Sequence, residues 1–91
     1  MTSKSEYLET LGARLALWNA ELAELASRAR ARADLEQALA ELRRLRDDAA
    51  AQTRAIERAG ESEWETLAGT AEKEFEALGA AFQRARSRFG E

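Results

Sequence analysis

Residues 26–34 read ASRARARAD, and they decide how this chain of 91 residues folds. The segment holds neither glycine nor proline, and its alanines and arginines favour a helix. Apolar side chains alternate at spacings of three and four on both sides of it, which is the a/d seam of a coiled coil. The seam shifts by three residues inside the segment, as at a stammer. We therefore expect one helix to run through residues 26–34.

This expected helix begins near Lys4, because Ser3 and Glu6 form a capping-box pattern there. Its first strong stop is Gly60, which we expect in the left-handed conformation that ends many helices. The first helix should therefore span about 4–59. Its seam consists of Leu8, Leu11, Leu15, Trp18, Leu22, Leu25 and Ala29, followed by Leu35, Leu39, Leu42, Ala49, Thr53 and Ile56.

A second helix is predicted over about 63–88, after a turn at 60–62. Ser62 and Glu65 form another capping-box pattern. Alanine, leucine, glutamate and arginine dominate the composition and valine is absent, so the fold class is all-α. Residues 1–91 then form a single helical-hairpin domain, a long antiparallel coiled coil. The apolar stripe of the second helix is Trp64, Leu67, Ala71, Phe75, Leu78, Phe82, Ala85 and Phe89.

The two expected helices differ in length, so a hairpin leaves the N-terminal half of the first helix uncovered. Soluble monomers rarely expose such a strip. The preferred arrangement is an antiparallel homodimer about 80 Å long, with a three-helix bundle at each end. The alternative is a monomeric three-helix bundle in which the first helix folds back at 27–34. We prefer the dimer because nothing in residues 26–34 breaks a helix.

Both arrangements bring the same side chains together. If Gly60 sets the register, Phe75 lies beside Leu45 and Arg46, and Phe82 lies beside Leu39. The N-terminal half then brings Leu15 and Trp18 toward Phe75, and Leu22 and Leu25 toward Phe82. The predicted core and self-association interface consists of Leu8, Leu11, Leu15, Trp18, Leu22, Leu25, Trp64, Phe75, Leu78, Phe82 and Phe89.

The composition argues against catalysis. The chain has no histidine and no cysteine, so it lacks the usual proton shuttle, nucleophile and soft metal ligands. Glu72 and Glu76 lie one helical turn apart, but carboxylate-bridged metal sites in helical bundles usually add histidine. We interpret them as a solvated acidic face. We expect no catalytic residue, no cofactor and no metal site.

The charge pattern also indicates whether nucleic acids or membranes are expected partners. The arginines at 28–46 are interleaved with acidic residues and the net charge is −3, so we expect no nucleic-acid binding. Phe75, Leu78, Phe82 and Phe89 resemble the stripe of an interfacial helix, although its glutamate-rich flanks oppose anionic lipid. Membrane-surface binding is kept as the alternative function. The N-terminus lacks a signal-peptide pattern and no apolar run approaches a membrane span, so we expect a cytoplasmic protein.

Three stretches resemble a family of small bacterial coiled-coil proteins that are described as stress-response proteins and were first noted in cyanobacteria. They are SKSEYLETLGARLALWNAEL (3–22), AGESEWETLAGTAEKEFEALGAAF (59–82) and SRF (87–89). The middle departs from the family, because arginine alternates with alanine at residues 28–32. The resemblance implies a helical hairpin, a link to stress and no established biochemical activity. The informative positions are Tyr7, Trp18, Asn19, Gly60, Trp64, Gly69 and 87–89.

Together these features predict a non-enzymatic coiled-coil interaction or scaffold protein. Its partner would be a second copy of the chain or an unidentified protein. Gly12, Gly69 and Gly79 interrupt otherwise good helices, which indicates either close helix approach or local flexibility. The sequence leaves that choice open.

Overall fold

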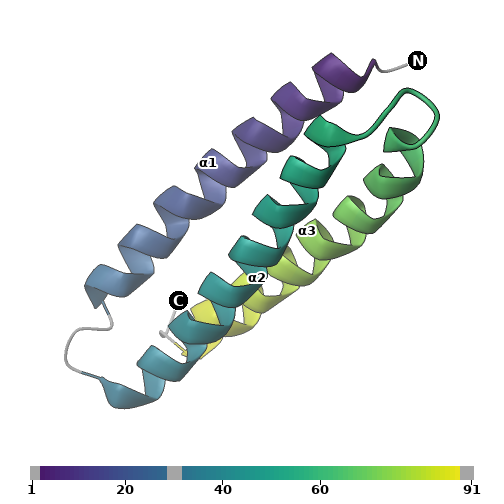
Figure 1. Cartoon of the computed structure of the whole chain (residues 1–91). Coiled ribbons are helices and arrows are strands. Elements are labelled where there is room, and N and C mark those ends of the chain that lie inside the picture. Colours follow the sequence, from purple (N-terminus) through teal and green to yellow (C-terminus); the bar gives the residue numbers. More distant parts are fainter. Residues whose placement is uncertain (1–2, 29–31, 89–91) are drawn as a thin grey trace.

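The computed structural model describes residues 3–28 and 32–88, and these residues form three helices and no strand (Figure 1). The helices are α1 (Lys4–Arg28), α2 (Ala33–Arg58) and α3 (Trp64–Arg88). They run up, down and up, so that α1 starts at the end of the molecule where the α2–α3 turn lies. The bundle measures 47 × 18 × 17 Å. The all-α prediction is confirmed.

The prediction of one helix over 4–59 is wrong. α1 ends at Arg28, and α2 begins at Ala33 after Arg32, whose backbone is extended with φ −131° and ψ 104°. Residues 29–31, on which part of that prediction falls, lie outside the described residues. The chain therefore adopts the arrangement expected as the alternative, a three-helix bundle.

The break has a physical reason, although no glycine or proline marks it. Helix propensities of ordinary residues differ by at most about 0.7 kcal/mol each, so interrupting a helix at a few positions costs little. Burying one large apolar side chain gains about 1.5–3 kcal/mol. Folding back buries Leu11, Leu22 and Leu25 of α1 within the same chain. The burial outweighs the local preference for a continuous helix.

The start of α1 is confirmed as predicted. The Glu6 amide donates to Ser3 Oγ at 3.1 Å and the Ser3 amide donates to Glu6 Oε1 at 3.3 Å, which is a reciprocal capping box. The neighbouring Lys4 has a second role that the sequence analysis missed. Its ammonium donates to the carbonyl oxygens of Glu57 at 3.1 Å and Ala59 at 2.7 Å. This cation closes the C-terminal end of α2 and ties α1 to it.

The α2–α3 turn differs from the expectation for Gly60. The chain leaves α2 through Ala59 in extended conformation, with φ −75° and ψ 148°, and Gly60 is not left-handed. The Gly60 carbonyl accepts hydrogen bonds from the amides of Glu63 at 3.0 Å and Trp64 at 3.2 Å. Within the described chain, no hydrogen bond joins Ser62 to Glu65, so the second capping box is also a wrong prediction. A backbone turn starts α3 instead.

The core runs along the whole bundle. Ala38, Ala81 and Ala85 lie between α2 and α3, and leucine and aromatic side chains make up most of the remaining core volume. Gly12 and Gly69 face open space, so close helix approach does not explain them, whereas a Cβ at Gly79 would lie 3.7 Å from Trp18 Cζ2. The buried apolar residues are Leu11, Leu22, Leu25, Leu35, Ala38, Leu39, Leu42, Ala49, Ile56, Trp64, Ala71, Phe75, Leu78, Ala81, Phe82 and Ala85.

Candidate functional site

The structure gathers the predicted interface residues into the core of a single chain. Leu8, Leu15 and Trp18 are half-buried and pack against it. Phe89 lies outside the described residues. As an interface between two copies, these residues stay a prediction, but the strip that motivated it is covered within one chain. The members that are buried are Leu11, Leu22, Leu25, Trp64, Phe75, Leu78 and Phe82.

The contacts between α1 and α3 differ from the predicted layers. Trp18 stacks on Phe82 rather than Phe75, with ring centroids 4.6 Å apart and an interplanar angle of 18°. The guanidinium of Arg14 lies over the Phe75 ring instead, 4.6 Å from its centroid. The predicted register took Gly60 as its only reference. In the structure, polar contacts along α1 and α3 also fix how the two helices align.

Two of these polar contacts centre on Glu72 of α3. Its Oε2 accepts a hydrogen bond from the Tyr7 hydroxyl at 2.6 Å and another from Arg14 Nη1 at 2.9 Å. The Tyr7 hydrogen bond, supported by Arg14, lowers the pKa of the Glu72 carboxyl although partial burial opposes this. Burial raises the pKa of the Tyr7 phenol, and the Glu72 carboxylate raises it further. Glu72 is therefore an ionised structural group that holds α1 onto α3.

The part of the chain that the structure describes contains no candidate metal site. No group of three or more Asp, Glu, His or Cys side chains is placed there to hold a metal ion. Glu72, the carboxylate considered from sequence, is engaged by Tyr7 and Arg14.

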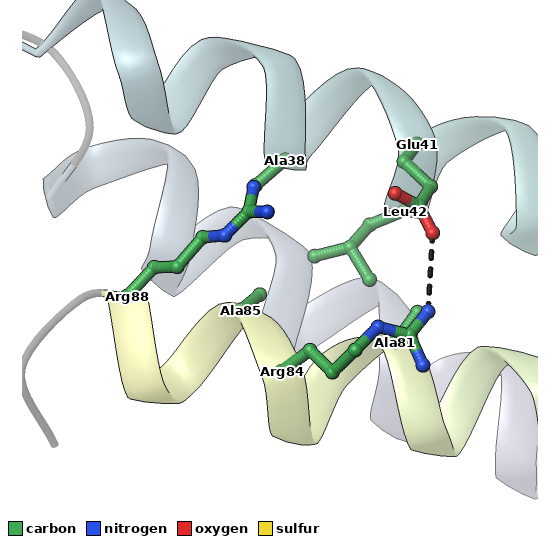
Figure 2. A pocket seen from close by; sticks show the side chains of 7 residues that line it. All are labelled: Ala38, Glu41, Leu42, Ala81, Arg84, Ala85 and Arg88. Carbon is green, nitrogen blue, oxygen red and sulfur yellow. Dashed lines mark hydrogen bonds and ion pairs between the residues drawn. The ribbon is translucent and has the colours of Figure 1, made fainter.

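Figure 2 shows a small hollow between α2 and α3. Glu41 and Arg84 form an ion pair at its rim, with Arg84 Nη2 3.2 Å from Glu41 Oε1, and Arg88 extends across it toward α2. Its volume is about 30 Å³, enough for about one water molecule, whereas small-molecule sites span about 300–1,000 Å³. The hollow therefore does not fit a substrate or cofactor. Its lining is Ala38, Glu41, Leu42, Ala81, Arg84, Ala85 and Arg88.

A second hollow, of about 260 Å³, lies at the α2–α3 turn and is open to solvent. Ser62, Glu63, Thr66 and Leu67 line it. It has two hydroxyls and the Glu63 carboxylate, but among the described residues no hydrogen bond joins that carboxylate to either hydroxyl, so no nucleophile and base are paired there.

Three of the arginines weighed for nucleic-acid binding have acidic partners in the structure. Arg28 pairs with Glu24 at 2.9 Å, Arg44 with Asp48 at 3.7 Å and Arg46 with Asp47 at 2.8 Å. Arg46 also donates to Asn19 Oδ1 at 2.8 Å, which joins α2 to α1. The positive charges of these three arginines are therefore interleaved with negative ones, and the absence of nucleic-acid binding stays a prediction.

The side of α1 that points away from the bundle is the most unusual surface. We call it the outer face of α1 and define it as the exposed residues between positions 10 and 23. Leu17 is 56% exposed and is the one exposed large hydrophobic residue among those described. None of the members of this face is charged, in a chain with 34% charged residues. They are Thr10, Gly12, Ala13, Ala16, Leu17, Asn19, Ala20 and Ala23.

Two charged residues beside this face, Arg14 and Glu21, are drawn toward α3, whereas the exposed Glu9 and Glu24 adjoin its two ends. Arg14 binds Glu72 at 2.9 Å, and Glu21 binds Arg86 at 2.5 Å. The exposed surface of α2 is different, because most of its residues are charged. They include Glu36, Glu41, Arg43, Arg44, Asp47, Arg54, Glu57 and Arg58. The sequence analysis missed the outer face of α1 because it followed only large apolar residues, although the alanine spacing was visible in the sequence.

No helix within residues 3–28 or 32–88 is long and apolar enough to cross a membrane. Phe75, Leu78 and Phe82, the described part of the stripe considered for lipid binding, are at most 2% exposed. No family model, no curated protein and no solved structure matches this chain. The likeness to the bacterial stress-response family therefore stays a prediction.

Proposed function

We propose that this chain is a non-enzymatic helical interaction protein that binds another protein through the outer face of α1. The observation that carries the proposal is the absence of charge on that face, together with the exposed Leu17. An apolar surface costs little to desolvate, whereas the charged faces of α2 and α3 must give up their hydration or find partners. A cytoplasmic location and the link to stress implied by the resemblance belong to this proposal.

The rest of the molecule supports an interaction role over a chemical one. The polar groups that cross between helices, such as Tyr7, Arg14 and Glu72, are used to hold the bundle together. The large aromatic side chains of α3 fill the core. Apart from Asn19, which accepts a hydrogen bond from Arg46 of α2 at 2.8 Å, the outer face of α1 makes none of these contacts, so most of it is available to a partner without opening the bundle.

The proposal is tested by capture of partners from the native cell, under resting and stress conditions, with the tagged full chain. Ala20→Glu places a charge in the middle of the outer face of α1, and Ala77→Glu places the same charge on the exposed surface of α3. We expect a partner to be retained by the wild type and by Ala77→Glu, and lost with Ala20→Glu. A partner retained equally by Ala20→Glu would contradict the proposal. Circular dichroism should show the same helix content in all three proteins.

A further inference from the structure

We propose that α1 detaches as a unit from the α2–α3 hairpin while the hairpin stays folded, so that α1 acts as a lid over the aromatic side of α3. We call the detached form the open state. The inference goes beyond the proposed function, which uses the outer face of α1 in the closed bundle. It concerns the opposite, inner side of α1.

α1 is less embedded in the core than α3. Three of its 25 residues are buried, against seven of 25 in α3. Its larger side chains Tyr7, Leu8, Leu15 and Trp18 pack against the core but are only partly buried. Because the gain from burial grows with the apolar area removed from water, detaching α1 costs less than detaching α3.

The spacing of the backbones shows the same difference. The backbone of α2 approaches both other helices closely, whereas the backbones of α1 and α3 stay farther apart. Long side chains bridge that gap. Trp18 stacks on Phe82, with 4.6 Å between ring centroids, and the Arg14 guanidinium lies 4.6 Å from the centroid of the Phe75 ring. Long side chains regain rotamer freedom when they are released, and this entropy favours the open state.

Polar contacts supply much of the remaining hold on α1. The side chains that make them are at least partly exposed in the closed bundle. Water can therefore replace these contacts when α1 leaves, and the open state contains no buried charge without a partner. The contacts join Lys4 to the carbonyls of Glu57 and Ala59, Tyr7 and Arg14 to Glu72, Asn19 to Arg46, and Glu21 to Arg86.

The α2–α3 hairpin is joined by contacts that do not involve α1. The Gly60 carbonyl closes the turn between the two helices, and Arg84 pairs with Glu41 at 3.2 Å. Small side chains lie between α2 and α3, which lets the two helices pack closely. They are Ala38, Ala81 and Ala85. These contacts remain when α1 detaches.

Detachment uncovers aromatic rings of α3. Phe75 and Phe82 are at most 2% exposed in the closed chain, and they contact Arg14 and Trp18 of α1. In the open state these rings face water, and the detached α1 loses helical structure because isolated helices are only marginally stable. Access to this apolar surface of α3 therefore depends on how often α1 leaves.

Native-state hydrogen exchange of the full chain, followed by NMR at low urea concentrations, tests the inference. Amides that exchange through the same opening share one opening constant. We expect the α1 amides to share a constant at least about tenfold larger than that of the slowest amides of α2 and α3. The α1 opening should also depend less on urea, because it exposes less surface than global unfolding. A single opening constant for all three helices would overturn the inference.

Two matched substitutions at exposed positions separate the two openings. Ala16→Gly in α1 should raise both opening constants about fivefold, because α1 melts in both. Ala77→Gly in α3 should raise the constant of α2 and α3 about fivefold and leave that of α1 unchanged, because α3 stays helical in the open state. If Ala77→Gly raises both constants equally, α1 opens only when the whole chain unfolds, and the inference is wrong.

Glu72→Gln tests the polar contacts that hold the lid. It removes the charge that Tyr7 and Arg14 bind, and it should raise the α1 opening constant at least about threefold. Glu41→Gln is the matched control, because it breaks the ion pair to Arg84 between α2 and α3 and should leave the α1 opening unchanged. An α1 opening that responds to Glu41→Gln but not to Glu72→Gln would contradict the proposal.

Discussion

The α2–α3 interface and the α1–α3 interface hold the same bundle together by different means. Between α2 and α3, small side chains let the backbones approach closely. α1 reaches α3 through long side chains instead, among them Tyr7, Arg14 and Trp18. The buried alanines of α2 and α3 are Ala38, Ala49, Ala71, Ala81 and Ala85, and of these Ala38, Ala81 and Ala85 line the hollow between the two helices.

This difference shows how a chain rich in alanine can make distinct surfaces from similar helices. Where alanine meets alanine, stability depends on volume, because close-packed interiors tolerate little extra bulk. Where aromatic rings and charged groups bridge two helices, stability depends on orientation and hydrogen bonding. Substitutions should therefore act on the two interfaces through different physical terms, with different sizes and different sensitivity to pH.

The largest effect is expected at Phe82, which both interfaces share. Its side chain is fully buried and stacks on Trp18. Phe82→Ala should lower the free energy of unfolding by about 3–5 kcal/mol, because it leaves a cavity in the centre of the bundle. Urea denaturation followed by circular dichroism measures this. A loss below about 1 kcal/mol would show that the core is not closed around Phe82.

Overpacking tests how closely the small side chains of α3 are packed in the core. Ala71 is fully buried, and Ala71→Leu should lower the free energy of unfolding by about 1–3 kcal/mol because the added atoms have no space. Ala77→Leu is the matched control on the exposed surface of α3, where we expect a change within about 0.5 kcal/mol. Equal effects of the two variants in urea denaturation would contradict close packing of α2 and α3.

Removal of one hydroxyl tests the α1–α3 interface. Tyr7→Phe keeps the ring beside Trp64, 5.8 Å between centroids, but removes the hydrogen bond to Glu72. We expect the free energy of unfolding to fall by about 1 kcal/mol. The pKa of Glu72 should move up toward its ordinary value, as measured by NMR titration. An unchanged Glu72 pKa would contradict the hydrogen bond.

Glu72 also makes the stability of the α1–α3 interface depend on pH, and we expect this effect to be smaller than that of Tyr7→Phe. The pKa of Glu72 is lowered from 4.5 in the folded protein, so the unfolded chain binds the proton first as the pH falls. The stabilisation from Glu72 is therefore complete above about pH 4.5 and is lost as the pH falls through the lowered pKa. Glu72→Gln should reduce the slope of stability against pH in this acidic range. The slope at neutral pH should not change.

The smallest effect is expected at the end of α2. Lys4→Met removes the ammonium that binds the carbonyls of Glu57 and Ala59 but keeps the aliphatic stem. The loss should be about 0.5 kcal/mol, typical of a partly exposed cation at a helix C-terminus. Lys73→Met, on the exposed surface of α3, is the control. Hydrogen exchange should show faster opening of the last turn of α2 in Lys4→Met only.

Much of the local structure could be predicted because it depends on neighbours in the sequence. Ser3 and Glu6 are three residues apart and bind each other's backbone amides wherever α1 lies. The 3–4 spacing of leucines and aromatics likewise identified the buried side of each helix. Ser62 and Glu65 carry the same local pattern, yet the Gly60 carbonyl binds the amides at that turn. A local pattern is decisive only where no competing contact is stronger.

By itself, the sequence determined that the chain is helical, where α1 starts and which side chains face the core. Only the tertiary structure decided that the first helix breaks before Ala33, that Trp18 stacks on Phe82 and that Lys4 closes α2. The physical reason is that these interactions act over different distances along the sequence. Helix propensity and capping act over a few residues with energies of about 1 kcal/mol or less. Burial of the α1 stripe joins residues distant in the chain with a larger total energy, and it left the uncharged side of α1 facing outward.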